Sequence, residues 1–342
     1  MKKIVVVGGG AIGLQVVGRL TQGGLPSMLL GRATGVQALR ESALTIRAPE
    51  GEYSTRVEAI TRPDELGSEQ RPPDLAILCV KGYDTAAAID TLRALEPRYV
   101  LSLQNGIGNE ERLAELFGRS RVIAGAITTS VELPNPTTVV ITKAGGIGLA
   151  GLDPTLDLTP WLEAFTAAGF PVRYYSDYRA LKWSKALLNM LGNALAAILD
   201  MPVPVIYANP RLVDIDLSAV REALAVMAAM NCAVVNLPGY PAATLAALAR
   251  FVPNPLLRPL MRRLVSRGRG GKEPSLLRDL RAGRTRSEGE QLYGAVAATA
   301  AAYATPAPIN SALWHILGGI VRGEIPWEQY RGQPTQLLAA LR

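Results

Sequence analysis

The sequence predicts an α/β domain over residues 1–172 followed by an all-α domain over residues 173–342. In the first part, short β-branched or apolar runs alternate with helical periodicity, which is typical of a mainly parallel sheet flanked by helices. From Asp177 onward one helical pattern follows another, separated by breaks that contain proline or glycine. A chain of 342 residues also suits two domains of ordinary size.

The composition limits the class of protein. With 49% hydrophobic and 19% charged residues, the chain has enough apolar side chains for a sizeable core. Cys79 and Cys232 belong to no CxxC pattern, and His315 is the single histidine, so we expect neither a metal site nor a disulfide framework. His315 lies in an apolar stretch and is expected to pack in the core.

No targeting or membrane segment is expected. The apolar run after Lys3 ends at Gly8, which is too short for a signal peptide, and the later apolar runs 186–199 and 223–235 are too short to span a membrane. Together with the cysteine usage, this predicts a cytoplasmic protein in a reducing compartment.

The net charge of +7 is compatible with nucleic acid or with a small anionic ligand. A basic stretch has no interleaved aromatic residues that could stack on bases, and it consists of Arg258, Arg262, Arg263, Arg267, Arg269 and Lys272. We therefore expect a solvated helix face and loop, with a lid that attracts an anionic substrate as the alternative, and no nucleic-acid partner.

A glycine motif follows the first predicted strand, Lys3–Val7. Its sequence is Gly8-Gly9-Gly10-Ala11-Ile12-Gly13, and a helical pattern then continues to Gly23. Gly8 suits the tight turn, Gly10 lets a pyrophosphate approach the backbone, and Gly13 allows close packing of helix on strand. The helix that starts at Ala11 and Ile12 would offer its N–H groups to the phosphates. This order predicts a Rossmann-type dinucleotide site.

The second predicted strand, Ser27–Leu30, ends at Gly31-Arg32, where an NAD site usually has an acidic residue for the ribose. Because an arginine there can pair with a 2′-phosphate, we predict NADP(H) rather than NAD(H). An ordinary surface arginine is the alternative.

Two further predicted strands, Asp74–Val80 and Tyr99–Leu103, run directly into Lys81 and Gln104-Asn105-Gly106. Ligands of open α/β sheets bind at the carboxyl ends of the strands, so Lys81 and Asn105 are candidates for contact with cofactor or substrate. A solvated strand end and an ordinary turn remain the alternatives.

Shorter segments fill out the first domain. Residues 43–47 and 53–57 are expected to form a hairpin or short strands. Three Thr- and Val-rich segments, at residues 122–130, 137–143 and 146–149, are expected to complete the sheet and its edge.

A polar stripe marks the helix expected over Ala180–Asn193. Lys185, Asn189 and Asn193 occur at i, i+4 and i+8, which would place them on one face of a mostly apolar helix. We expect this stripe to line an active-site cleft between the domains, with an exposed surface seam as the alternative. Lys185 is placed to protonate a forming alkoxide, and Lys182 is the competing choice.

At this point the sequence resembles the 2-dehydropantoate 2-reductase (ketopantoate reductase) family over nearly its whole length. The motifs that carry the resemblance are Gly8 to Gly13, Gln104-Asn105-Gly106, the Lys185/Asn189/Asn193 helix, Pro274 to Asp279, and Gly283-Arg284 followed by Glu288.

The resemblance implies NADPH-dependent reduction of 2-dehydropantoate to (R)-pantoate, a step toward pantothenate and coenzyme A. It implies Lys185 as the general acid and Glu288 as the residue that binds the substrate hydroxyl groups and helps set the lysine. It also implies cofactor contacts from Arg32 and Lys81, and a cofactor or substrate contact from Asn105. The implied substrate ligands are Asn189, Asn193 and Ser275.

One departure affects the acidic residue. The family usually has G-R-x-T-E, whereas this chain reads Gly283-Arg284-Thr285-Arg286-Ser287-Glu288, with one residue more and serine for threonine. Glu290 is therefore the alternative to Glu288.

The expected partner is a small anionic keto acid, and the candidate oligomer is a homodimer. Three other functions stay open: an NADP-dependent reductase or dehydrogenase of another 2-keto or hydroxy acid, an opine-forming enzyme, and a non-catalytic NADP-binding sensor.

Overall fold

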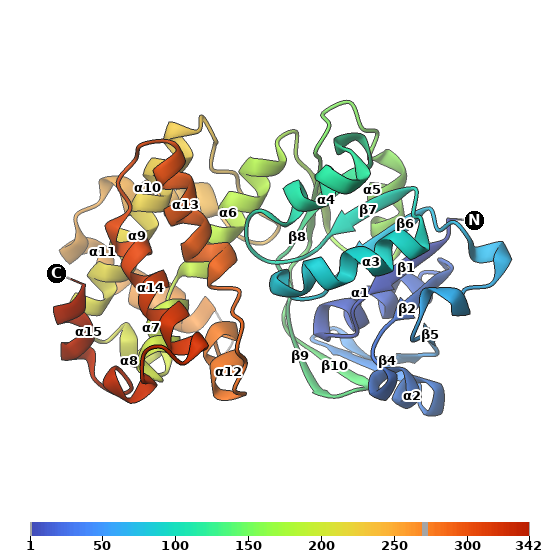
Figure 1. Ribbon diagram of the computed structural model, residues 1–342, viewed down its shortest axis with the longest axis horizontal. Coiled ribbons are helices and arrows are strands. Elements are labelled where there is room, and N and C mark those ends of the chain that lie inside the picture. The colour runs from blue at the N-terminus through green and yellow to red at the C-terminus, as the bar shows by residue number, and fades with distance from the viewer. Residues whose placement is uncertain (1, 269–272, 342) are drawn as a thin grey trace. The chain divides into compact units, whose positions relative to one another are not determined.

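The computed structural model describes residues 2–268 and 273–341. The contacts divide the chain into two compact units, which are Met1–Lys182 with Leu237–Tyr240, and Trp183–Asn236 with Pro241–Arg342. Figure 1 shows strands and helices alternating along the first unit and helices alone along the second. The division falls between Lys182 and Trp183, inside one helix and later than residue 172. Within the described residues, no helix is both long and apolar enough to cross a membrane.

The main sheet of the first unit has eight strands. They are β1 (Ile4–Val7), β2 (Ser27–Leu30), β5 (Glu58–Ile60), β6 (Leu75–Leu78), β7 (Tyr99–Ser102), β8 (Val122–Ile127), β11 (Ile147–Gly151) and β12 (Val172–Tyr174). Their order is β12-β11-β8-β7-β6-β1-β2-β5, and only the β8–β11 pair is antiparallel. Because β1 lies between β2 and β6, the chain builds the sheet outward from β1 in both directions. The carboxyl ends of β1 and β6 therefore form a topological switch point.

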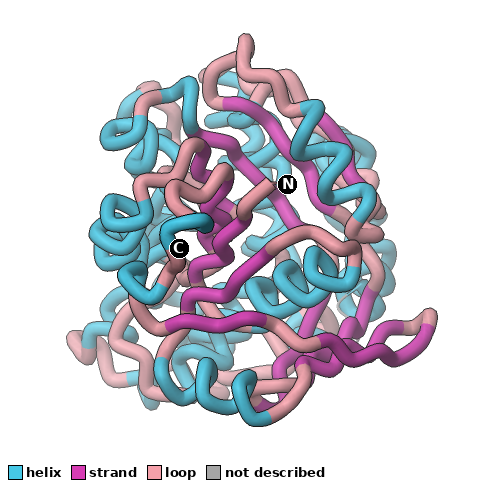
Figure 2. Tube along the Cα trace, turned by 90° about the vertical axis from the view of Figure 1, so that its right-hand side faces the viewer, coloured by secondary structure: helices cyan, strands magenta, loops and turns pink. Residues whose placement is uncertain are grey.

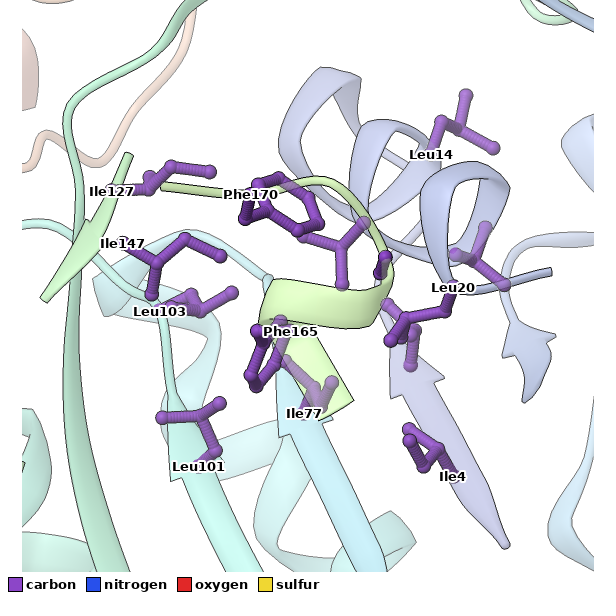
Figure 3. Close-up of a cluster of buried hydrophobic side chains, with 14 of the residues drawn as sticks. Ile4, Leu14, Leu20, Ile77, Leu101, Leu103, Ile127, Ile147, Phe165 and Phe170 are labelled. Atoms are coloured by element: carbon purple, nitrogen blue, oxygen red, sulfur yellow. The ribbon is translucent and has the colours of Figure 1, made fainter. Parts of the chain in front are cut away.

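Helices cover both faces of this sheet. They are α1 (Ala11–Gln22), α2 (Ala33–Glu41), α3 (Thr85–Leu95), α4 (Asn109–Phe117) and α5 (Thr159–Ala167). In β1, Val6 packs in a cluster with residues of α1 and α5, whereas Val5 and Val7 pack in a second cluster with residues of α3 and α4. Figure 3 shows part of the first cluster, where Phe165 lies close to Ile77. Burial on both faces explains why the strands read as continuous apolar runs.

A separate four-stranded sheet belongs to the same unit. Its strands are β3 (Leu44–Ala48), β4 (Gly51–Thr55), β9 (Ser130–Asn135) and β10 (Thr138–Lys143), in the order β4-β3-β10-β9. The predicted hairpin is confirmed as the antiparallel β3–β4 pair. The prediction that segment 137–143 completes the main sheet is wrong. Val139 and Ile141 are buried while their neighbours are half-buried, so β10 covers a core on one face only. In Figure 2 the strands of both sheets are magenta.

The second unit is helical, which together with the first unit confirms the predicted fold class. The chain from Tyr178 onward forms α6 (Tyr178–Met190), α7 (Asn193–Leu199), α8 (Val203–Ile206), α9 (Pro210–Ala229), α10 (Ala242–Phe251), α11 (Asn254–Gly268), α12 (Ser275–Arg281), α13 (Ala295–Ala302), α14 (Pro308–Arg322) and α15 (Pro334–Ala340). The longest of them, α9, starts where the Asn209 side chain accepts a hydrogen bond from Arg211 N at 3.0 Å.

His315 departs from its expected place. The side chain is exposed on α14, whereas Leu313, Ile316 and Leu317 on the same helix are buried. The prediction that His315 packs in the core is therefore wrong, because the helix turns this position away from its apolar face.

Candidate active site

The glycine motif forms a tight turn between β1 and α1. Gly8 has φ +115°, and a Cβ there would lie 3.0 Å from the carbonyl carbon of Cys79. A Cβ on Gly13 would lie only 1.9 Å from the carbonyl oxygen of Gly8. Gly10 differs from both, because a Cβ there would meet nothing within 4 Å. The turn is thus closed at Gly8 and Gly13 and open at Gly10, where the motif requires room for a pyrophosphate.

The first turn of α1 presents donors without a competing side chain. Gly10 is the N-cap, so no cap side chain accepts from the helix, and Ala11, Ile12 and the two residues after them include no acidic group. The first N–H groups of a helix and its positive dipole end favour an anion. These features fit the phosphates of a dinucleotide.

The strand ends bring the other candidate residues of this unit to one edge of the sheet. Arg32 follows β2, Lys81 follows β6 and Asn105 follows β7, and these strands lie next to β1 or to each other. The ladder aligns the final residues of the four strands, which are Leu30, Val7, Leu78 and Ser102. Arg32 is exposed, while Lys81 and Asn105 are half-buried. The predicted convergence at the strand ends is therefore present within this unit.

Lys182, the competing proton donor, is buried at 4% exposure and held by three oxygens. Its Nζ lies 2.7 Å from Glu110 Oε1, and it donates to the carbonyls of Gln104 at 2.6 Å and Gly125 at 3.3 Å. Two carbonyls accept hydrogens from the ammonium group, and the Glu110 carboxylate pairs with its charge. Burial raises the pKa of Glu110, and the positive charge of Lys182 opposes that rise. This arrangement favours Lys185 over Lys182 as the proton donor.

The helix predicted over Ala180–Asn193 is interrupted. Helix α6 ends at Met190, Gly192 adopts φ +66°, and α7 begins at Asn193. Lys185 and Asn189 share a helix, but Asn193 does not continue their stripe, so the prediction of one face for all three is wrong. A glycine directly after an apolar helical run is a common helix-ending signal that indicates this break.

Buried side chains hold the break in place. The Gly192 N–H donates to Asp216 Oδ2 at 2.8 Å, and Asp216 also accepts from the Tyr207 hydroxyl. The Tyr293 hydroxyl donates to the Met190 carbonyl at 2.6 Å and accepts from Ala194 N at 3.0 Å. These partners compensate the backbone groups that the interrupted helix leaves without helical bonds.

The Asn193 side chain connects the backbone of Asn189, near the end of α6, to the start of α12. Its Nδ2 donates to the Asn189 carbonyl at 3.1 Å, and its Oδ1 accepts from Leu276 N at 3.3 Å. Ser275 is the first residue of α12, so Asn189, Asn193 and Ser275 lie close together in the helical unit. Asn193 is 3% exposed, whereas Asn189 and Ser275 are half-buried.

The two candidate carboxylates differ in burial. Glu288 is 3% exposed, and Glu290 is an exposed residue at the start of a π-helical turn, Glu290–Gly294. The segment before the turn is packed closely, because a Cβ on Gly289 would lie 2.8 Å from the Leu317 side chain. Of the two carboxylates, only Glu288 is therefore shielded from solvent.

The basic stretch is only partly described. The Arg258 Nε donates to Asp214 Oδ1 at 2.9 Å, while Arg262 and Arg263 are exposed. Arg269 and Lys272, and the side chain of Arg267, lie outside the described residues. The solvated-face interpretation fits Arg262 and Arg263, whereas Arg258 is half-buried and pairs with Asp214.

The described part of the chain contains no cluster of three or more His, Cys, Asp or Glu side chains able to hold a metal ion. Cys79 and Cys232 are free thiols.

A mainly parallel sheet with a glycine turn at its switch point, followed by a helical unit, defines the class: a Rossmann-type fold with an all-helical second unit. Family models then identify the particular group. The model described as Ketopantoate reductase PanE/ApbA matches residues 4–153, and its C-terminal counterpart matches residues 177–321. The chain belongs to the ketopantoate reductase family.

Named relatives agree with this assignment. The chain is 34% identical over 224 residues to a 2-dehydropantoate 2-reductase of Pyrococcus horikoshii, covering 64% of this chain and 71% of the relative. It is 24% identical over 326 residues to the enzyme of the same name from Archaeoglobus fulgidus, covering 94% and 99%.

Solved structures show the same architecture. A 2-dehydropantoate 2-reductase from Geobacter metallireducens has a TM-score of 0.78 at 26% identity, covering 92% of this chain and 98% of that chain. A D-mandelate dehydrogenase solved with NADH and anilino(oxo)acetate also reaches a TM-score of 0.78, at 19% identity and with 94% and 99% covered, and it shows the fold alone.

Proposed function

We propose that the protein reduces 2-dehydropantoate to (R)-pantoate with NADPH, a step toward pantothenate and coenzyme A. Membership of the family supports the reaction. The observation that carries the proposal is the pair Lys185 and Asn189, which are half-buried and one turn apart on α6 between apolar, mostly buried neighbours. Reduction of a keto acid requires a proton donor for the oxygen that becomes the alcohol, and Lys185 can supply it.

The cofactor site proposed for the first unit has two parts. Gly8, Gly10, Ala11, Ile12 and Gly13 form the turn and helix start that fit the pyrophosphate. Arg32, Lys81 and Asn105, at the adjacent strand ends, complete the proposed site.

The choice of NADPH rests on Arg32. This exposed arginine at the N-cap of α2 could pair with the 2′-phosphate of NADPH.

Bound NADPH would supply the hydride that is added to the keto carbon of the substrate. Lys185 donates a proton to the oxygen that becomes the alcohol. Asn189, Asn193 and Ser275, which lie close together in the helical unit, bind the keto acid and orient it. Hydride and proton together convert the ketone to a hydroxyl group, so the reaction consumes one NADPH and one proton per turnover.

Glu288 is proposed to bind the hydroxyl group of the substrate and to help set Lys185. Its burial supports this role over Glu290. Replacing Glu288 with Gln, which keeps the shape but removes the charge, should raise KM for the keto acid by about tenfold. The same change at the exposed Glu290 should leave KM unaltered in steady-state assays, and the reverse result would move the role to Glu290.

We also propose that the enzyme is cytoplasmic and forms a homodimer. The free thiols Cys79 and Cys232 are compatible with a reducing compartment. Light scattering coupled to size-exclusion chromatography measures the oligomeric state, and a monomeric mass would contradict the dimer.

The reaction is tested by following NADPH absorbance with ketopantoate beside a panel of other 2-keto acids, with and without amines. Preferred turnover of ketopantoate supports the proposal. Preference for another keto acid would assign a related reductase, and amine-dependent turnover would assign an opine-forming enzyme. NADPH binding without turnover on any keto acid would favour a sensor.

A further inference from the structure

Gln104 holds the backbone on both sides of Lys81. The side chain is 4% exposed, and its Nε2 donates to the carbonyls of Val80 at 3.1 Å and Lys81 at 3.3 Å. The same nitrogen lies 2.8 Å from Thr85 Oγ1. The two carbonyls belong to the peptide groups that precede and follow the Cα of Lys81. One buried amide therefore restrains both backbone angles of a residue proposed to bind the cofactor.

Asn105 is restrained in the same way by two other side chains. The Gln104 carbonyl, in the peptide group before Asn105, accepts from Lys182 Nζ at 2.6 Å. The Asn105 carbonyl, in the peptide group after it, accepts from Asn109 Nδ2 at 3.0 Å. Asn109 is 1% exposed, so neither donor is easily replaced by water. The direction in which the Asn105 side chain leaves the backbone is fixed from both sides.

The ion pair between Lys182 and Glu110 positions the ammonium group that donates to the Gln104 carbonyl. Lys182 and Glu110 have side chains exposed at only 4% and 1%, and the two charged atoms are 2.7 Å apart. A buried ion pair often contributes no more stability than apolar side chains of similar volume. Its evident effect here is on position, because it brings an ammonium group to the carbonyl that precedes Asn105.

We propose that Gln104, Asn109, Lys182 and Glu110, which we call the strand-end clamp, are positioning residues that preset Lys81 and Asn105 for the cofactor. This inference rests on the proposed function, which assigns cofactor contacts to Lys81 and Asn105. Because the clamp fixes backbone conformation before binding, it lowers the ordering cost of association. Its loss should weaken NADPH binding without removing the proton donor.

The test uses two variants that avoid leaving a buried charge. Lys182→Met/Glu110→Gln removes the ion pair as a unit, and Gln104→Met removes the amide while keeping an unbranched side chain. The control is Arg93→Met/Asp90→Asn, which removes an exposed ion pair of α3 whose charged atoms lie 3.3 Å apart.

Three measurements separate positioning from a merely structural role. Calorimetry should show the NADPH dissociation constant of both clamp variants raised by about tenfold. Steady-state assays should show a similar rise in KM for NADPH, with kcat changed by less than about threefold because Lys185 is untouched. Hydrogen exchange on the ligand-free protein should be faster at residues 80–84 and 103–108 in the variants. The control should match the wild type in all three.

The proposal is contradicted if both clamp variants fold, bind NADPH as tightly as the wild type and show the same rate of hydrogen exchange. If the variants do not fold, exchange on the wild type decides. Protection of residues 103–108 before NADPH is added supports the clamp, and protection that arises only with NADPH overturns it. A wild type that binds NADPH but reduces no keto acid contradicts the proposed reaction and still allows the binding comparison. A wild type that binds no NADPH contradicts the proposed cofactor, and exchange in the variants then decides on the clamp.

Discussion

In the first unit the candidate residues follow the ends of four adjacent parallel strands, whereas in the helical unit they lie around a break between α6 and α7. Strand ends are positioned by the ladder, so Lys81 and Asn105 arrive at the same edge as the glycine turn. The helix break is positioned instead by distant side chains such as Asp216 and Tyr293. The comparison teaches that the ladder of the sheet positions the candidate residues of the first unit, whereas side chains distant in the sequence position those of the second.

The largest expected effect belongs to Lys185, the proposed proton donor. Lys185→Ala should lower kcat by about 100-fold or more, because loss of a general acid typically removes that much rate. The NADPH dissociation constant should not change, since the residues proposed to bind the cofactor lie in the first unit. NADPH absorbance gives kcat, and calorimetry gives the binding constant.

Arg179→Ala is the control for Lys185, because Arg179 is an exposed residue of the same helix. Its turnover should equal that of the wild type. Near-normal kcat in Lys185→Ala would show that Lys185 is not the proton donor. The proposal that the helical unit supplies the proton donor through this lysine would then be wrong.

Two alanine substitutions in the glycine turn should have different effects, one mainly on stability and the other mainly on NADPH affinity. Gly13→Ala places a Cβ 1.9 Å from the Gly8 carbonyl oxygen, and it should destabilise the protein by about 1–3 kcal/mol or more, as overpacking does. Gly10→Ala meets nothing within 4 Å, so its loss of stability should stay below about 1 kcal/mol. Its NADPH dissociation constant should nevertheless rise by about tenfold, because the methyl group fills the space needed by the pyrophosphate.

Thermal unfolding and NADPH titration check this pair. Unchanged NADPH affinity in Gly10→Ala would show that the open position is not where the phosphates bind. It would also remove the main physical support for placing the cofactor at the turn.

Replacing Arg32 tests which nicotinamide dinucleotide the first unit prefers. Arg32→Ala should raise KM for NADPH by about tenfold and leave KM for NADH unchanged, because only NADPH carries the 2′-phosphate. Arg40→Ala is the control, since Arg40 is exposed on the same helix and pairs with Glu65 at 3.1 Å. A wild type that prefers NADH in the same assays would refute the assignment.

The smallest effect concerns the helix break. Gly192 and Gly283 share φ +66°, but a Cβ on Gly192 would lie 3.2 Å from the Tyr207 ring whereas one on Gly283 meets nothing within 4 Å. Alanine should therefore cost about 1–2 kcal/mol at Gly283 from backbone strain and somewhat more at Gly192. Only Gly192→Ala should also raise KM for the keto acid, because Asn193 follows directly.

Denaturant unfolding and steady-state kinetics measure both variants. Equal losses of stability together with an unchanged KM would mean that the packing around the break does not control the site.

The sequence by itself determined the features that depend on neighbouring residues. The glycine turn could be predicted because a strand, the three motif glycines and a helix start occur within a few residues, and at Gly13 the steric reason is local, since a Cβ there would meet the Gly8 carbonyl oxygen. The strand that ends at Leu30 and the positions of Arg32, Lys81 and Asn105 followed from short apolar runs and their ends. The division into an α/β part and a helical part followed from the change of period.

Tertiary structure decided what depends on residues far apart in the chain. The second sheet forms because β10 pairs with β3, which no local pattern specifies. Lys182 finds its partner in Glu110, and Asn193 finds Leu276 N, so their roles could not be read from spacing. Helical periodicity describes which face a side chain occupies only while the helix continues, and the left-handed Gly192 ended it before Asn193.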